Sequence, residues 1–105
     1  MPDFLSVYIT VPAREAAGTI ARALVEERLA ACVNILPAMH SVYRWQGKVE
    51  EADEWALIAK TRAALFAALE KRVKELHPHA CPCIAGWPIV AGHRPYLDWI
   101  ETETR

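Results

Sequence analysis

The order in which strand-like and helix-like hydrophobic patterns alternate along this chain restricts its fold more than any other feature. Residues 4–11 alternate with period two and are apolar on both sides, which is typical of a central strand that ends at Pro12. Residues 14–29 carry the apolar stripe of an amphipathic helix. Residues 31–45 are extended again, and because Pro37 interrupts them we expect one bent or bulged strand.

The second half of the chain continues this alternation. After a turn at Gln46-Gly47, residues 48–60 are predicted to form the partner strand of a hairpin. The acidic first half of that strand is expected to project from the body of the protein. Thr61 is a candidate N-cap for a second helix, and His77-Pro78 ends that helix.

The last part of the chain predicts one further strand and one short helix. Residues 81–90 have a strand pattern that contains Pro82 and Pro88, and prolines are accommodated in an edge strand rather than a central one. A short terminal helix is expected through residues 96–100. The fourth strand is therefore predicted to lie at an edge of the sheet.

The resulting order of strand, helix, strand, strand, helix, strand predicts an α+β fold. It is that of the ferredoxin-like (βαββαβ) sandwich, here with a short C-terminal helix. Two helices cover only one face of such a sheet, and the other face would carry some share of Tyr8, Trp55 and Trp87. Large uncovered apolar surfaces usually mark interfaces, so we expect a homo-oligomer. With 105 residues and no repeat or linker, residues 1–105 are predicted to form a single domain.

Charge and cysteine content exclude several classes of function. The 12 Lys and Arg residues are scattered and outnumbered by 13 Asp and Glu residues, which argues against a nucleic-acid partner or an anionic membrane surface. No secretory signal or apolar run of membrane-spanning length is visible. Three cysteines cannot all pair, and Cys81 and Cys83 are too close for an easy bridge in an extended chain, so no disulfide scaffold is expected and a reducing compartment is favoured. We expect a cytoplasmic protein.

A run of alternating imidazole and thiol side chains is the main candidate site. In an extended segment His77, His79, Cys81 and Cys83 would project from one face. These ligands suit Cu or Zn rather than Ca or Mg. The row would span roughly 20 Å, so a complete site needs ligands from another segment or chain. The alternative is structural: His77 closes a helix and the cysteines fill small buried spaces.

Six segments of the chain resemble the CutA divalent-cation-tolerance family over nearly its full length. They are residues 9–12 (ITVP), 24–35 (LVEERLAACVNI), 41–47 (SVYRWQG), 60–61 (KT), 77–78 (HP) and 96–100 (YLDWI). The resemblance implies a ferredoxin-like subunit in a tight homotrimer similar to the PII signalling trimers, with a role in tolerance of divalent metals, copper especially.

Within this resemblance, one segment departs from the family pattern. Family members commonly have His-Pro-Tyr-Glu-x-Pro-Glu-Ile where this chain has Ala80 and Cys83 in place of the two glutamates. His77 carries over, and Cys32 matches the family's strand cysteine, so Cys32 joins the candidate metal ligands. Soft ligands thus replace hard ones in this segment.

The sequence leaves two other classes of function open. A PII-like signalling or scaffold trimer would bind a small ligand or protein partner in clefts between its subunits. The chain has no Gly-rich phosphate loop, so a nucleotide ligand has no direct support. Cys32 with His40, or Cys83 with His93, could be imagined as nucleophile and base, but such pairs are coincidences of sequence until geometry supports them. We therefore expect a non-enzymatic protein that requires no cofactor and binds Cu or Zn.

Overall fold

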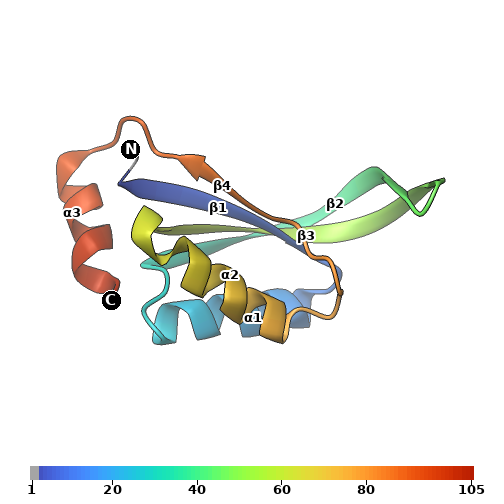
Figure 1. Cartoon of the computed structure of the whole chain (residues 1–105), viewed down its shortest axis with the longest axis horizontal. Helices are drawn as coiled ribbons and strands as arrows, with labels where there is room; N and C mark the ends of the chain where they lie inside the picture. The colour runs from blue at the N-terminus through green and yellow to red at the C-terminus, as the bar shows by residue number, and fades with distance from the viewer. Residues whose placement is uncertain (1–2) are drawn as a thin grey trace.

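The structure is a computed structural model that describes residues 3–105, and these form one antiparallel sheet with helices against it (Figure 1). The strands pair in the order β2-β3-β1-β4. The elements follow one another as predicted: β1 (Phe4–Val11), α1 (Arg14–Glu26), β2 (Cys32–Trp45), β3 (Lys48–Arg62), the 3₁₀ turn η1 (Ala63–Leu65), α2 (Phe66–Leu76), β4 (Ile84–Pro88) and α3 (Arg94–Glu103).

The core lies between the sheet and the pair of helices α1 and α2, which lie on the same side of it (Figure 1). Alternate residues of β1, Val7, Ile9 and Val11, are fully buried and point toward these helices. Ile20 of α1 and Leu69 of α2 meet them from the other side. The burial of these apolar side chains supplies the main driving force for this arrangement.

The opposite face of the sheet carries aromatic groups without a helical cover. Tyr8 of β1 stacks on Trp87 of β4 with ring centroids 5.3 Å apart, and Trp87 is 51% exposed. Trp55 lies on the helix-covered face instead, because it pairs with the buried Val11 and packs against the core. The expectation that Trp55 contributes to the open face is therefore wrong, whereas Tyr8 and Trp87 do contribute.

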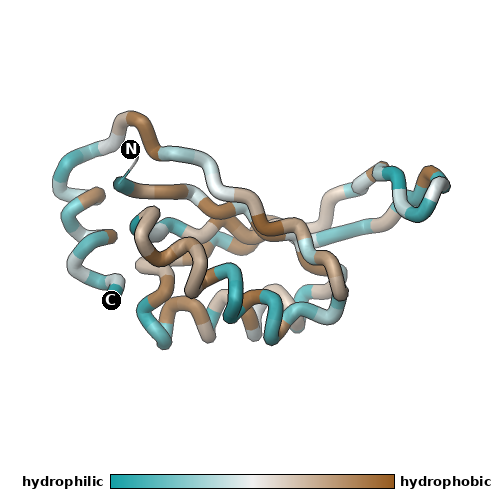
Figure 2. Tube along the Cα trace, in the orientation of Figure 1, coloured by the Kyte–Doolittle hydropathy of each residue, from teal (hydrophilic) through white to brown (hydrophobic). Residues whose placement is uncertain are grey.

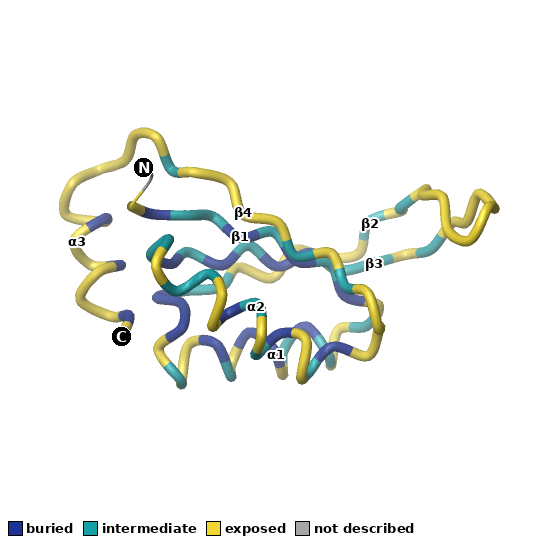
Figure 3. Tube along the Cα trace, in the orientation of Figure 1, coloured by how far each residue is buried: buried dark blue, intermediate teal, exposed yellow. Residues whose placement is uncertain are grey.

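The hairpin of β2 and β3 extends well beyond the helices and gives the molecule extents of 44 × 25 × 23 Å (Figures 1 and 3). Its tip is a turn in which Gln46 and Gly47 have φ values of 49° and 80°, a left-handed conformation that glycine adopts at low cost. The register shifts between Leu36 and Met39, which confirms the predicted bulge near Pro37. The projection of the acidic segment is also confirmed, and its hydrophilic residues are visible in Figure 2.

Helix α1 ends at Glu26, three residues earlier than predicted. Arg28 adopts a φ of 61°, a left-handed conformation that stops the helix. The amides of Leu29 and Ala30 both donate to the carbonyl oxygen of Leu24, which closes the helix end, and both side chains enter the core. The apolar pattern extends beyond the end of α1 because Leu29 and Ala30, although they lie in the loop, pack into the core.

Thr61 does not cap the second helix. It lies in β3 opposite Leu5, is fully buried, and its Oγ1 donates to the carbonyl oxygen of Leu29 at 2.6 Å. Helix α2 begins only at Phe66, after η1, and its N-cap residue Leu65 makes no side-chain capping bond. The hydroxyl thus ties the end of β3 to the loop after α1.

The fourth strand is shorter than predicted, since β4 begins at Ile84 and ends at Pro88. Its pairing with β1 starts where Ile84 meets Ile9, and no strand is assigned to residues 77–83. Pro82 has no amide hydrogen to donate to a ladder. The edge position is confirmed, because β1 pairs with β4 on one side and with β3 on the other.

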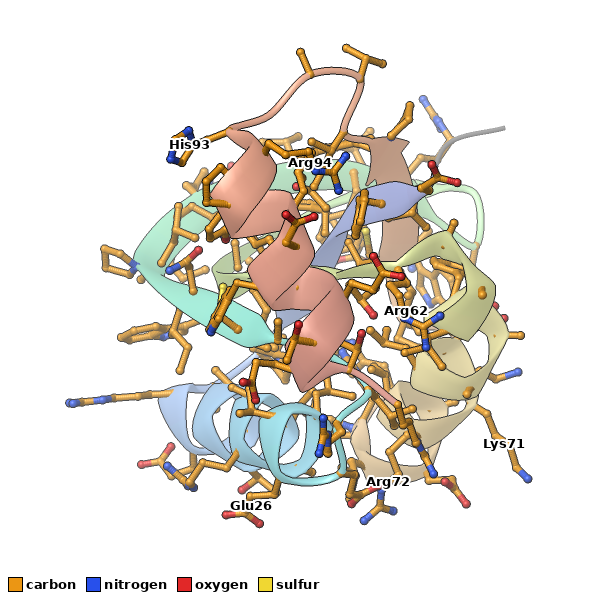
Figure 4. The ribbon with its side chains drawn as sticks, turned by 90° about the vertical axis from the view of Figure 1, so that its left-hand side faces the viewer. Glu26, Arg62, Lys71, Arg72, His93 and Arg94 are labelled. Carbon is orange, nitrogen blue, oxygen red and sulfur yellow. The ribbon has the colours of Figure 1, made fainter. Side chains whose placement is uncertain are left out.

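Helix α3 closes one end of the sheet (Figure 4). There Leu97 and Ile100 pack on Phe4 and Ala31. It is longer than the predicted residues 96–100. Its C-terminal end is held by Arg28, whose Nη2 donates to the carbonyl oxygen of Thr102 at 2.7 Å. Within residues 3–105, no helix is both long enough and apolar enough to cross a membrane.

Candidate functional site

A groove of about 580 Å³ lies between the segment after α2 and the β2–β3 hairpin. Three elements and one loop form its wall. The hairpin contributes Ser41, Tyr43, Trp45 and Glu54, β1 contributes Thr10, and the loop contributes Pro78, His79, Ala80, Cys81 and Cys83. The groove therefore contains three of the five predicted metal ligands together with two exposed aromatic rings.

His77 is a buried anchor beside this groove rather than one of the groups that line it. Its Nδ1 accepts a hydrogen bond from the amide of His79 at 3.0 Å, so the proton of the neutral ring lies on Nε2. Nε2 donates that proton to the carbonyl oxygen of Thr10 at 2.7 Å. Both ring nitrogens thus have protein partners, and His77 fixes the start of the loop against β1.

His79, Cys81 and Cys83 are exposed and lie in the loop between α2 and β4. The ring of His79 lies 5.2 Å from that of His77, at an interplanar angle of 52°. The pairing of β4 with β1 does not extend to Cys81 or Cys83. The side chains are therefore gathered by a bent loop and not by the single face of a strand.

Cys32 lies apart from the groove. It begins β2 opposite Lys60, toward the end of β3 that is remote from Glu54. Its Sγ lies 3.6 Å from the hydroxyl of Tyr96 in α3, and Tyr96 stacks on Trp99 with centroids 5.7 Å apart. Burial, followed by the hydrogen bond to Cys32 and its charge, raises the pKa of Tyr96 to about 12.

The five predicted ligands do not form a ready-made metal centre in one subunit. Across residues 3–105, no group of three or more His, Cys, Asp and Glu side chains is arranged to hold a metal ion. The structure gathers His79, Cys81 and Cys83 around one groove; His77 is buried beside it with both ring nitrogens engaged, and Cys32 lies in another part of the sheet.

Tyr8 and Met39 lie close to this region, but the sequence indicated neither of them as a site residue. The hydroxyl of Tyr8 donates to Sδ of Met39 at 3.6 Å. Partial burial, followed by the charges of Cys83 and Glu54, raises the pKa of Tyr8. Burial and then the nearby negative charge both disfavour the phenolate, so Tyr8 stays a neutral hydrogen-bond donor. Only the bulge after Leu36 brings Met39 here, and periodicity does not predict a bulge's side-chain contacts.

A second cluster lies on the projecting hairpin, where His40 bridges two carboxylates. Its Nε2 lies 2.6 Å from Oε1 of Glu51, and its Nδ1 lies 3.0 Å from Oδ1 of Asp53. The hydrogen bond to Glu51 and then that to Asp53 raise the pKa of His40. His40 is thus engaged away from Cys32, and β4 separates Cys83 from His93, so neither imagined pair of nucleophile and base is assembled.

The fold and this groove define a small α+β protein with a four-stranded antiparallel sheet and a loop rich in His and Cys between its second helix and its edge strand. Residues 5–103 match the family described as CutA1 divalent ion tolerance protein. The chain belongs to this family.

Individual relatives agree with this assignment. The divalent-cation tolerance protein CutA of Thermus thermophilus is 56% identical over 98 residues, which are 93% of this chain and 95% of that protein. The solved structure of this relative superposes with a TM-score of 0.96, 54% identity, and coverage of 97% of this chain and 99% of that one. The CutA protein of Archaeoglobus fulgidus is 47% identical over 95 residues, 90% and 92% of the two chains. Against the chloroplastic CutA protein of Arabidopsis thaliana the chain spans 54% of the relative.

Proposed function

We propose that this protein is a non-enzymatic, homotrimeric divalent-metal tolerance protein that binds soft metal ions, copper above all, at the groove beside the α2–β4 loop. Membership in the divalent ion tolerance family supports the metal role. The convergence of His79, Cys81 and Cys83 on one groove is the observation that carries the choice of site. Thiolate and imidazole ligands favour Cu and Zn over Ca and Mg.

Binding of the ion would itself bring the ligands of this site together. The pairing with β1 stops at Ile84, so Cys81 and Cys83 can turn toward an ion without breaking a ladder hydrogen bond. His79 supplies an imidazole from the same loop, and His77 keeps the base of the loop fixed on β1. Cys32 is too closely tied to Tyr96 at another part of the sheet to belong to this ligand set. Three free cysteines suit a reducing compartment such as the cytoplasm.

The trimer is proposed from the uncovered face of the sheet. The strand order β2-β3-β1-β4 supports a ferredoxin-like subunit, and its open face presents Tyr8, Trp87 and Leu36. The projecting hairpin exposes further apolar side chains, Val42 and Val49 among them, which a single chain leaves in water. The PII-like arrangement of three subunits would cover these surfaces.

Light scattering tests the assembly. Trp87→Asp places a charge on the open face and should reduce the mass from that of three chains toward that of one. Val90→Asp is the matched control, because Val90 is exposed just beyond the end of β4. A parent protein that is monomeric at micromolar concentration contradicts the proposed trimer.

Metal competition tests the site. Calorimetric titration of the metal-free protein with Zn²⁺, and with Cu⁺ held by a competing chelator, should show binding that the double variant Cys81→Ser/Cys83→Ser loses. Cys32→Ser is the control, since its thiol lies outside the groove, and it should bind as the parent does. Equal binding by the parent and the double variant would show that the loop is not the metal site.

The groove also favours a second candidate, a PII-like signalling or scaffold trimer. A space of about 580 Å³ lined by Tyr43 and Trp45 has the size and aromatic content of a small-molecule site. A screen of small metabolites by thermal unfolding discriminates between the two functions. A metabolite that raises the melting temperature of the double cysteine variant as much as that of the parent supports this second function.

A further inference from the structure

We infer that Cys81 and Cys83 form a redox-active dithiol, which closes to a reversible disulfide across Pro82 by exchange with a low-molecular-weight disulfide. Such a dithiol does not need to bind a metal. The segment that carries the two thiols has three relevant properties: the thiols are free, they are exposed, and no strand pairing holds their backbone.

Access is the first requirement for exchange. Cys81 and Cys83 are both exposed and both line the groove of about 580 Å³, so their sulfur atoms are open to a small disulfide in solution. Cys32 differs, because it is only partly exposed and its Sγ contacts the hydroxyl of Tyr96. The two thiols at the groove are therefore the ones that an oxidant reaches.

Freedom of the backbone is the second requirement. Even in an extended chain, two Cα atoms separated by one residue lie only roughly 6.6 Å apart, which is within the range of about 4.4 to 6.8 Å found for disulfides. Cys81 and Cys83 lie in a bent loop and not in an extended strand, so the backbone is free to turn their Cβ atoms toward each other. The pairing of β4 with β1 ends at Ile84, and Pro82 has no amide hydrogen, so the turn disrupts no ladder hydrogen bond.

The position of the loop keeps this change local. His77 fixes one end through its bonds to Thr10 and to the amide of His79, and Ile84 fixes the other end in the ladder with Ile9. Closure of the disulfide therefore rearranges a segment of a few residues and leaves the sheet and the core unchanged.

The exchange balances in two steps. The thiolate of one cysteine attacks a sulfur of the small disulfide, forms a mixed disulfide and releases one small thiol. The second cysteine then attacks the protein sulfur of that mixed disulfide, which forms the bond between Sγ of Cys81 and Sγ of Cys83 and releases the second small thiol. The small disulfide is reduced to two thiols and the dithiol is oxidised by two electrons. A bridge across a single residue is strained, so small thiols should reopen it readily.

Mass spectrometry of the metal-free protein in its native assembly, with oxidised glutathione as the probe, tests the inference. Trypsin places both thiols on one peptide, residues 75–105, because Arg94 precedes Pro95, and it places Cys32 on another peptide. The parent and Cys32→Ser should lose two hydrogens from the 75–105 peptide and retain no glutathione. Cys81→Ser and Cys83→Ser should each retain one glutathione, because the second step is blocked.

Three results would overturn the inference: unreacted thiols in the 75–105 peptide of the parent, a stable glutathione adduct on the parent, or disulfides between chains instead of within one. Reduced glutathione should restore the parent peptide, and a bridge that it fails to reopen would contradict the strained closure. Because no metal is present in these reactions, their failure leaves the proposed metal binding untouched. If the parent undergoes the exchange as expected but binds neither Zn²⁺ nor Cu⁺, only the proposed metal function is refuted.

Discussion

The imidazole of His77 joins the loop after α2 to the strand β1, since its Nε2 donates to the carbonyl oxygen of Thr10 at 2.7 Å. The same ring accepts the amide of His79 on Nδ1 at 3.0 Å. A histidine that looked like the first ligand of a metal row is thus a buried connector. It sets where His79, Cys81 and Cys83 lie relative to the hairpin that forms the other wall of the groove.

Replacement of His77 should destabilise the protein and affect metal binding only indirectly. His77→Ala removes both bonds, so the carbonyl of Thr10 loses the imidazole donor and the amide of His79 loses its acceptor, which should cost about 1–3 kcal/mol. Denaturant unfolding at a fixed protein concentration measures this loss. His93→Ala is the control: His93 is exposed, makes no capping bond to α3, and points away from the body (Figure 4). A His77→Ala variant as stable as the control would contradict the anchoring role.

Thr61 gives a second test of a buried polar contact. Thr61→Val keeps the shape of the side chain but removes the donor to the carbonyl oxygen of Leu29. Leaving that oxygen without its partner should cost about 1–3 kcal/mol of unfolding free energy, measured by denaturant unfolding. Thr19→Val on the exposed surface of α1 makes the same chemical change without such a bond and should cost less than about 0.5 kcal/mol.

Hydrophobic periodicity predicted the order of the elements because the core is built from it. The alternation through Val7, Ile9 and Val11 is the buried face of a central strand. Thr61 was misread because a threonine before a helix has the same signature whether it caps that helix or ends a buried strand. What distinguishes the two cases is the partner of the hydroxyl: Thr61 donates to the carbonyl oxygen of Leu29, which is distant in the sequence.

The candidate site was harder to predict than the fold. The alternation of His77 to Cys83 resembles a strand, yet a strand also needs a partner, and β1 offers pairing only from Ile84 onward. The residues that complete the groove, Tyr43 and Trp45 in particular, come from the hairpin and meet the loop only through the tertiary fold. The local sequence pattern of either segment therefore does not predict that the two segments form one groove.

Arg28 combines a left-handed backbone with a side-chain bond, and two substitutions separate these effects. Arg28→Ala removes the donors to the carbonyl oxygens of Thr102 and Glu103 but keeps a Cβ at a φ of 61°. Arg28→Gly removes the same donors and also relieves the backbone. We expect Arg28→Gly to be more stable than Arg28→Ala by about 1 kcal/mol in denaturant unfolding.

Hydrogen exchange supplies the second readout for Arg28. Both variants should exchange the amides of α3 faster than the parent, because the Arg28 side chain holds the C-terminal end of that helix. The amides of α2 make no contact with this side chain and serve as the internal control. Unchanged exchange in α3 would show that its packing on Phe4 and Ala31 alone holds the helix in place.

The bridge from His40 to Glu51 and Asp53 should make the projecting hairpin sensitive to pH. Both carboxylates favour the imidazolium, so the pKa of His40 in the folded hairpin is raised above its ordinary value of 6.5. Protonation of His40 therefore stabilises the pairing of β2 with β3 in the hairpin. This contribution to stability is fully present below pH 6.5 and is lost as the pH rises through the raised pKa of His40. Because all three groups are exposed, the effect should be small and should shrink with added salt.

Titration by NMR measures this prediction directly. The ring protons of His40 should titrate above pH 6.5, and Glu51→Gln and Asp53→Asn should each lower that midpoint. Glu50→Gln is the matched control, because Glu50 is adjacent to Glu51 on β3 and so points to the opposite face of the hairpin. The control removes the same charge without touching the bridge, so its midpoint should move less than those of the other two variants. A shift as large in Glu50→Gln would mean that the net charge of the hairpin, and not the two hydrogen bonds, sets the pKa of His40.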